Sequence, residues 1–193
     1  MRNASLETAV LEGCISCAGI SAESLLQASR AAFTETLYDI DDDLLLAHLS
    51  AYAALLKVML TEGSNSMHPP LELLAFLLDM QIPQRLAEHP GFKWRNLLST
   101  VQKAHHKSND FPKIVAAVHV YCGLADIPSI RNEVLKKLIS MLKTNPYPRV
   151  RMSVAEALFS VTRDESLGSQ NWAAPIAKTK AVISKLEQKY ITG

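Results

Sequence analysis

The chain has 193 residues, of which 48% are hydrophobic, and a net charge of only +1, so it carries enough apolar material for a sizeable core. Its seven glycines and the scarcity of alternating β-branched runs argue against a mainly β protein and favour an all-α fold. Three cysteines do not make an even disulfide framework, so a reduced intracellular compartment is expected.

Periodic apolar residues predict about nine helices, joined by short turns that contain proline or aspartate. The first helix ends near Gly19, and the acidic turn Asp39–Asp43 precedes a long helix that is apolar nearly all round. We expect that helix to be central and buried, and we expect no membrane span, because His48 and Lys57 interrupt its apolar run. The expected helices cover residues 4–18, 22–38, 44–61, 71–80, 92–107, 130–142, 149–162 and 172–190, with a single turn at 84–88 and a further helix from Asp110 to about Ala125.

Two prolines near the C-terminus predict a break between two amphipathic helices. Pro146 cannot continue the preceding helix, whereas Pro148 suits the first turn of the next one. The spacing from Ala116 to Ala155 is close to the period of about 40–47 residues of two-helix HEAT-type repeats. Pro148–Arg151 resembles the start of the second helix of such a repeat. The sequence therefore predicts a HEAT/armadillo-like stack of helical hairpins, an α-solenoid.

Charge is distributed unevenly along the chain. Residues 1–90 contain four Lys/Arg and twelve Asp/Glu, whereas residues 91–193 contain sixteen Lys/Arg and seven Asp/Glu. This split suggests that the basic half meets an acidic partner. The alternative is that both halves simply present ordinary solvated faces.

The Cys and His residues do not form a convincing chemical motif. Cys14 and Cys17 make a C-x-x-C without a preceding strand or a second pair, so both are expected to fill the core. His105 and His106 point about 100° apart on a helix, and we expect them at an exposed helix end. No glycine-rich phosphate loop or nucleophile–base constellation occurs in the sequence. The chain is expected to be no enzyme and to need no cofactor or metal; the alternative is a helical enzyme that uses these Cys and His residues.

A basic ridge on the C-terminal half is the candidate contact surface. It comprises Lys136, Lys137, Lys143, Arg149 and Arg151, and Tyr147 is a further candidate contact. For Arg151 the alternative is a structural role, in which the guanidinium bonds neighbouring carbonyls or acids between repeats. Nucleic-acid binding is not expected, because exposed aromatic residues are not interleaved with the basic ones.

Four stretches resemble the C-terminal region of the tubulin-folding cofactor D family. They are Ala18–Leu25, Ser108–Ile114, Val118–Cys122 and Asn145–Arg151. The resemblance extends from about residue 12 to residue 162 and rests on spacing and scattered matches rather than on a catalytic motif.

The resemblance implies a chaperone role in tubulin folding. Cofactor D is a large HEAT-repeat chaperone that binds β-tubulin and, with cofactors C and E and an Arf-like small GTPase, assembles and disassembles the αβ-tubulin heterodimer. Members of this family are much longer, so we expect residues 1–193 to be a single C-terminal domain of a longer chain. The resemblance also implies a cytoplasmic protein associated with the microtubule cytoskeleton. The alternative is a general HEAT adaptor of the transport or phosphatase type.

Overall fold

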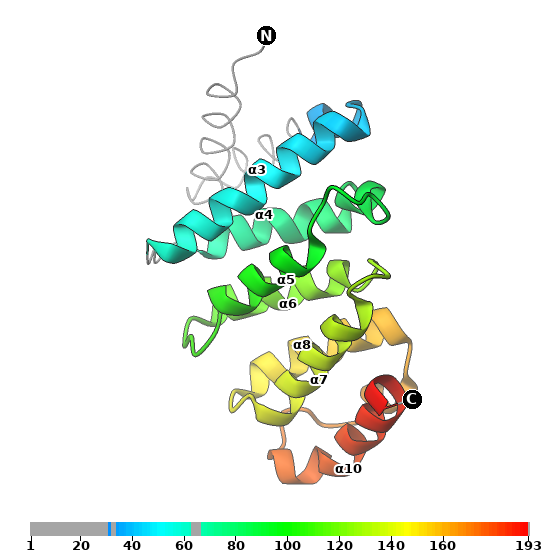
Figure 1. Ribbon diagram of the computed structural model, residues 1–193. Coiled ribbons are helices and arrows are strands. Elements are labelled where there is room, and N and C mark those ends of the chain that lie inside the picture. The colour runs from blue at the N-terminus through cyan, green and yellow to red at the C-terminus, as the bar shows by residue number, and fades with distance from the viewer. Residues whose placement is uncertain (1–30, 32–33, 63–66, 193) are drawn as a thin grey trace. The chain divides into compact units, whose positions relative to one another are not determined.

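The computed structural model describes residues 31, 34–62 and 67–192 (Figure 1). Helices and the turns between them account for these residues, and no strand occurs among them, which confirms the all-α fold class. The predicted helix at 4–18, most of the one at 22–38, and the C-x-x-C motif lie outside the described residues. The chain divides into two compact units, residues 1–104 and 105–193. That they form a single domain stays a prediction.

The first unit begins, in its described part, with a helical segment at 34–38 and an acidic turn. Asp41 caps the helix that follows, because its carboxylate accepts a hydrogen bond from the Leu44 amide at 2.8 Å. Asp42 and Asp43 occupy the first turn, where the helix dipole favours negative charge. The elements of this unit are α3 (Asp42–Thr61), α4 (His68–Asp79), the 3₁₀ turn η1 (Pro83–Leu86) and α5 (Trp94–Ala104).

Helix α3 is buried along one stripe only, which corrects the expectation of a helix buried all round. The stripe consists of Leu45, Leu49, Tyr52 and Leu56. This helix packs on α5 and η1, and it is the one helix among the described residues that is long and apolar enough to cross a membrane. Only 22% of its most apolar window is buried. Core helices of soluble proteins meet the same length and composition criteria, so the absence of a membrane span stays a prediction.

Arg85 fastens the turn before α3 to η1. Its guanidinium donates to the carbonyl oxygens of Leu37, Tyr38 and Ile40 at 3.2, 3.3 and 2.7 Å. It also donates to the Asp42 carboxylate at 2.6 Å. The planar guanidinium of arginine suits such a cluster of acceptors. One side chain therefore provides hydrogen-bond donors for the carbonyls at the end of one helix and for a carboxylate at the beginning of the next.

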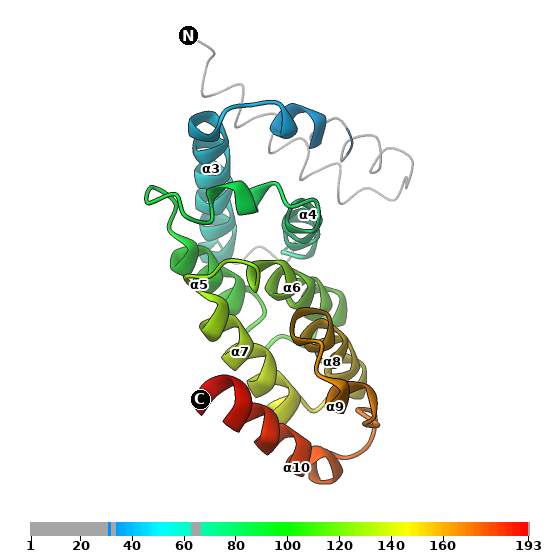
Figure 2. The same cartoon turned by 90° about the vertical axis from the view of Figure 1, so that its right-hand side faces the viewer.

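The second unit is built from paired helices. Helix α6 packs on α7 and α8, and Figure 2 shows α10 beside α7 and α9 beside α8. Their facing sides carry small and branched apolar residues that are almost fully buried, as expected for helical hairpins of the HEAT/armadillo type. The elements are α6 (Phe111–Leu124), α7 (Arg131–Thr144), α8 (Pro148–Thr162), α9 (Glu165–Gly168), α10 (Ile176–Glu187) and the π-helical turn η2 (Gln188–Thr192).

The predicted proline junction lies between α7 and α8. Helix α7 ends at Thr144, and Pro148 is the first residue of α8. Asn145 and Tyr147 have extended backbone angles, which is the conformation that a following proline favours. Two adjacent helices are thereby joined by a connection of three residues, as the sequence predicted.

The last helix begins later than the sequence predicted. Trp172 lies in the preceding loop, where it is buried and its indole N–H donates to the Leu167 carbonyl at 2.8 Å. Pro175 directly precedes α10, and its ring disfavours helical backbone at Ala174. The expected helix 172–190 is therefore divided into a loop, α10 and the π-helical turn.

Arg131 connects three helices of the second unit. Its guanidinium donates to the Ala125 carbonyl at the end of α6 at 2.6 Å and to the Val161 carbonyl near the end of α8 at 3.2 Å. Because Arg131 is itself the first residue of α7, the contact fixes the start of one helix against the ends of two others.

Candidate protein-interaction site

A basic cleft lies in the second unit, where α6 and α7 meet their connecting loops. We call it the Lys137 cleft; its volume is about 460 Å³. Two lysines and two histidines line it, and none of the described lining residues is acidic. The lining residues are His105, His106, Lys107, Ser108, Asn109, Ile114, Lys137, Met141, Thr144, Asn145, Pro146 and Tyr147.

Tyr147 ties together the two loops that form the rim of this cleft. Its hydroxyl donates to Asn109 Oδ1 at 3.0 Å, and its ring contacts the Phe111 ring edge to face, with centroids 4.5 Å apart. Its amide donates to Asn145 Oδ1 at 3.0 Å, which stabilises the turn between the helices. Asp110 caps α6 beside the rim by accepting a hydrogen bond from the Lys113 amide at 3.2 Å. The rim is therefore positioned by side-chain bonds on both loops.

A buried histidine–tyrosine pair includes one residue of the lining, His105. His105 Nε2 and the Tyr121 hydroxyl are 2.6 Å apart, and the two rings meet edge to face. Burial is the largest cause that lowers the pKa of His105 to about 4; Lys137 contributes to the shift, and a backbone hydrogen bond opposes it. Burial also raises the pKa of Tyr121. The pair is therefore neutral at neutral pH.

Lys137 supplies the inner positive charge of the cleft. Its side chain is half-buried, and burial lowers its pKa from the ordinary value. The charged groups that act on the neighbouring His105 are Lys137, His106 and Lys113, which are all cationic when protonated. The local field therefore favours an anionic group, because an arriving carboxylate would meet several cations at once.

The structure brings together only part of the predicted contact residues. Lys137 and Tyr147 line the Lys137 cleft, whereas Lys136 and Arg149 are exposed outside it. Lys143 is also outside the lining and is engaged, because its ammonium donates to the Glu187 carboxylate at 2.8 Å. Ion pairs at such exposure are weak, so Lys143 can exchange this partner at low cost.

Arg151 has the arrangement that the structural alternative predicted for it. It is only 3% exposed, and its guanidinium donates to the carbonyls of Asn145 and Pro146, both at 3.0 Å. It also donates to the carbonyls of Trp172 and Ala174, at 3.2 and 2.8 Å. Arg151 thus holds the proline junction against the loop before α10, and its donors face the chain itself.

Sequence reasoning missed the part of the cleft that precedes α6. His105 was expected at an exposed helix end, but it is 7% exposed, because α5 ends at Ala104 and the ring turns toward Tyr121. Lys107 has a positive φ of 54°, a conformation that lysine rarely adopts and that redirects the chain toward α6. The one sequence signal for this turn is Ser108–Asp110, which supplies the cap.

The described residues contain no group of three or more His, Cys, Asp or Glu placed to hold a metal ion. The described residues of the Lys137 cleft therefore provide positive charge, hydrogen-bond donors and an aromatic ring. These groups suit the recognition of an anionic protein surface.

Comparisons with known proteins identify the family. The family model for the C-terminal region of tubulin folding cofactor D matches residues 1–113, which is more than half of the chain. No curated protein and no solved structure matches the chain. On the strength of the family match, the chain belongs to the tubulin folding cofactor D C-terminal family.

Proposed function

We propose that this chain is a non-enzymatic protein-interaction domain of a tubulin-folding chaperone. It binds β-tubulin and takes part in assembly and disassembly of the αβ-tubulin heterodimer. The observation that carries the proposal is the family match over residues 1–113. It is supported by the all-α fold, since stacked helical pairs present extended side-chain surfaces to partner proteins.

The Lys137 cleft is the contact that we assign to the second unit. Lys137 provides charge at its centre, Tyr147 forms a preordered rim, and Lys136 and Arg149 add exposed charge. Lys143 joins them when it exchanges Glu187 for the partner. Tyrosine and arginine, here Tyr147 and Arg149, are enriched among the energetically important residues of protein contacts.

The partners in this proposal are β-tubulin, cofactors C and E and the Arf-like small GTPase, which the chaperone would help to regulate. The corresponding location is the cytoplasm, in association with the microtubule cytoskeleton. A general HEAT adaptor would instead bind transport or phosphatase components.

The test is capture of each purified partner by the immobilised chain. We expect retention of tubulin or of at least one of the other proposed partners, with weaker retention by Lys137→Gln. Lys185→Gln is the matched control, because Lys185 is an exposed lysine on α10. Retention of none of the proposed partners would refute the proposal.

A further inference from the structure

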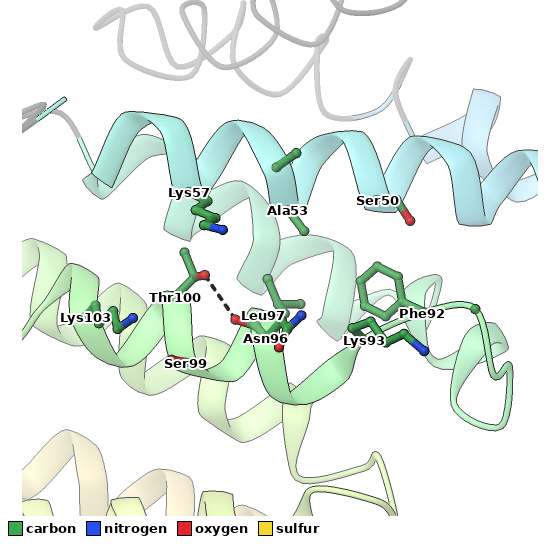
Figure 3. A pocket seen from close by; sticks show the side chains of 12 residues that line it. Ser50, Ala53, Lys57, Phe92, Lys93, Asn96, Leu97, Ser99, Thr100 and Lys103 are labelled. Atoms are coloured by element: carbon green, nitrogen blue, oxygen red, sulfur yellow. Dashed lines mark hydrogen bonds between the residues drawn. The ribbon is translucent and has the colours of Figure 1, made fainter. Parts of the chain in front are cut away.

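A second basic cleft lies in the first unit, between α3 and α5 (Figure 3). We call it the three-lysine cleft; its volume is about 380 Å³, within the range of about 300–1,000 Å³ that is usual for ligand sites. Its lining consists of Ser50, Ala53, Ala54, Lys57, Gly91, Phe92, Lys93, Asn96, Leu97, Ser99, Thr100 and Lys103.

This cleft is positively charged, although the unit that contains it, residues 1–104, has a net negative charge. Residues 1–104 contain twelve Asp/Glu and only seven Lys/Arg. Three of those seven, Lys57, Lys93 and Lys103, line the cleft, and none of its described lining residues is acidic. Arg85, a fourth, is engaged with Asp42 and three backbone carbonyls. All the lysines among the described residues of this unit therefore line one cleft.

Two helices hold the lysines on opposite walls. Figure 3 shows Lys57 extending from α3 toward the wall that carries Thr100 and Lys103. Lys93 lies at the other end, just before α5, and its ammonium donates to the Pro90 carbonyl at 3.1 Å. For Lys57 and Lys103 the structure gives no intramolecular hydrogen bond to another described residue. These two lysines are therefore available to an external anion.

The floor of the cleft is small and apolar. Ala53 and Ala54 lie on α3, and Leu97 lies on α5. Gly91 also belongs to the lining, and a Cβ at this position would lie 2.9 Å from Leu46 Cδ2, outside the lining. Phe92 is buried and packs edge to face on Trp94, with centroids 4.6 Å apart. The small side chains of Ala53 and Ala54 leave room for short side chains of a bound segment.

We propose that the three-lysine cleft binds an acidic segment of a protein partner. Its carboxylates lie against Lys57 and Lys103, and short apolar side chains cover the alanine floor. The proposal deepens the proposed function, since it names the chemistry of the segment that the domain recognises. The cleft lies wholly within residues 50–103, inside the part of the chain that the family model matches.

The lining favours a peptide over a single-stranded nucleic acid. Non-specific binding of single strands relies on aromatic faces on which bases stack. Phe92 is the aromatic residue in the lining, and its ring is buried against Trp94. Carboxylates, in contrast, need only the ammonium groups and the neutral donors of Ser50 and Asn96 that the cleft presents.

The test uses the whole chain and a fluorescein-labelled peptide of alternating Glu and Ala, followed by fluorescence anisotropy at low salt. We expect binding that weakens as salt is added. Lys57→Gln with Lys103→Gln should lower the affinity about tenfold, because two exposed charge contacts are lost. Lys178→Gln with Lys180→Gln is the charge-matched control on α10 and should change it less than about twofold.

Three results would overturn the proposal. One is equal affinity of the wild type and the Lys57/Lys103 double variant. Another is equally tight binding of a matched Gln/Ala peptide. The third is tighter, Lys57- and Lys103-dependent binding of a single-stranded oligonucleotide or of anionic lipid vesicles. Circular dichroism of the double variant should match the wild type, because both lysines are exposed.

The same variant separates this proposal from the proposed function. Equal capture of tubulin by the wild type and the Lys57/Lys103 double variant would count against the cleft as a tubulin contact and leave the chaperone role in place. Lysine-dependent binding of the Glu/Ala peptide without capture of any proposed partner would support the cleft and refute the tubulin role.

Discussion

His105 Nε2 and the Tyr121 hydroxyl form a buried hydrogen bond of 2.6 Å, and His105 also lines the Lys137 cleft. The pKa of His105 is about 4 in the folded protein, whereas a histidine in an unfolded chain has a pKa near 6.5. Between these two values the unfolded state binds a proton that the folded state does not. Stability therefore falls as the pH falls through this range.

The first prediction concerns this pH dependence. Between pH 7.5 and pH 5 the contribution of His105 to the free energy of unfolding should fall by about 2 kcal/mol. His105→Gln should lose that part of the pH dependence, as measured by urea unfolding at both pH values. His106→Gln, which changes the exposed neighbour, should keep it. Identical pH profiles for the wild type and His105→Gln would contradict the assignment.

The second prediction concerns Arg151. Arg151→Met should lower the free energy of unfolding by about 3 kcal/mol or more, because four carbonyls lose a charged donor in a buried setting. Arg149→Met should change it by less than about 0.5 kcal/mol, since Arg149 is exposed. Thermal or urea unfolding of the two variants measures these changes in the free energy of unfolding. Equal losses for the two variants would argue against the structural role of Arg151.

The third prediction concerns backbone strain at Lys107. The left-handed conformation costs a residue with a Cβ about 1–2 kcal/mol, and glycine avoids this penalty. Lys107→Gly should therefore raise the free energy of unfolding by a few tenths to about 1 kcal/mol. The same change in the middle of α7, Lys136→Gly, should lower it by about 1 kcal/mol. A destabilised Lys107→Gly protein would show that the conformation is not strained.

The fourth prediction concerns the attachment of the C-terminal turn. Asp164 accepts hydrogen bonds from Lys189 Nζ at 2.9 Å and from the Tyr190 hydroxyl at 3.0 Å, and the bond from Lys189 is the main reason that its pKa lies well below the usual range. Asp164→Asn should speed hydrogen exchange of the η2 amides and leave the α6 amides unchanged. Glu165→Gln is the control, because Glu165 is the neighbouring residue and is exposed. Unaltered exchange in η2 would mean that these bonds do not secure it.

Local rules made part of the fold predictable. Pro146 and Pro148 act through their own rings, so the junction between α7 and α8 could be located without knowledge of the packing. Pro175 acts in the same way, and the predicted helix from Trp172 was wrong because this proline disfavours helical backbone before it. Hydropathy described the composition of α3 correctly, but it carries no information on which of its faces another element covers.

The candidate site was less accessible to sequence reasoning. Lys137 and Tyr147 were among the predicted contact residues, whereas their association with Lys107 and Asn109 depends on how two loops meet. His105 and His106 are chemically alike, and only packing against Tyr121 makes one of them buried. The three-lysine cleft arises from residues on α3 and α5 that are far apart in the chain, so no local motif indicates it.

Arg85, Arg131 and Arg151 all direct their guanidinium groups at backbone carbonyls. The described lining residues of both clefts, by contrast, include lysines and no arginine. Amine acylation removes the charge of lysine and leaves guanidinium unmodified. Acetylation of the chain should therefore remove the lysine charges of both clefts, while these three arginines keep the helix ends in place. Binding of an acidic partner would then be weakened by a lysine modification that leaves the fold intact.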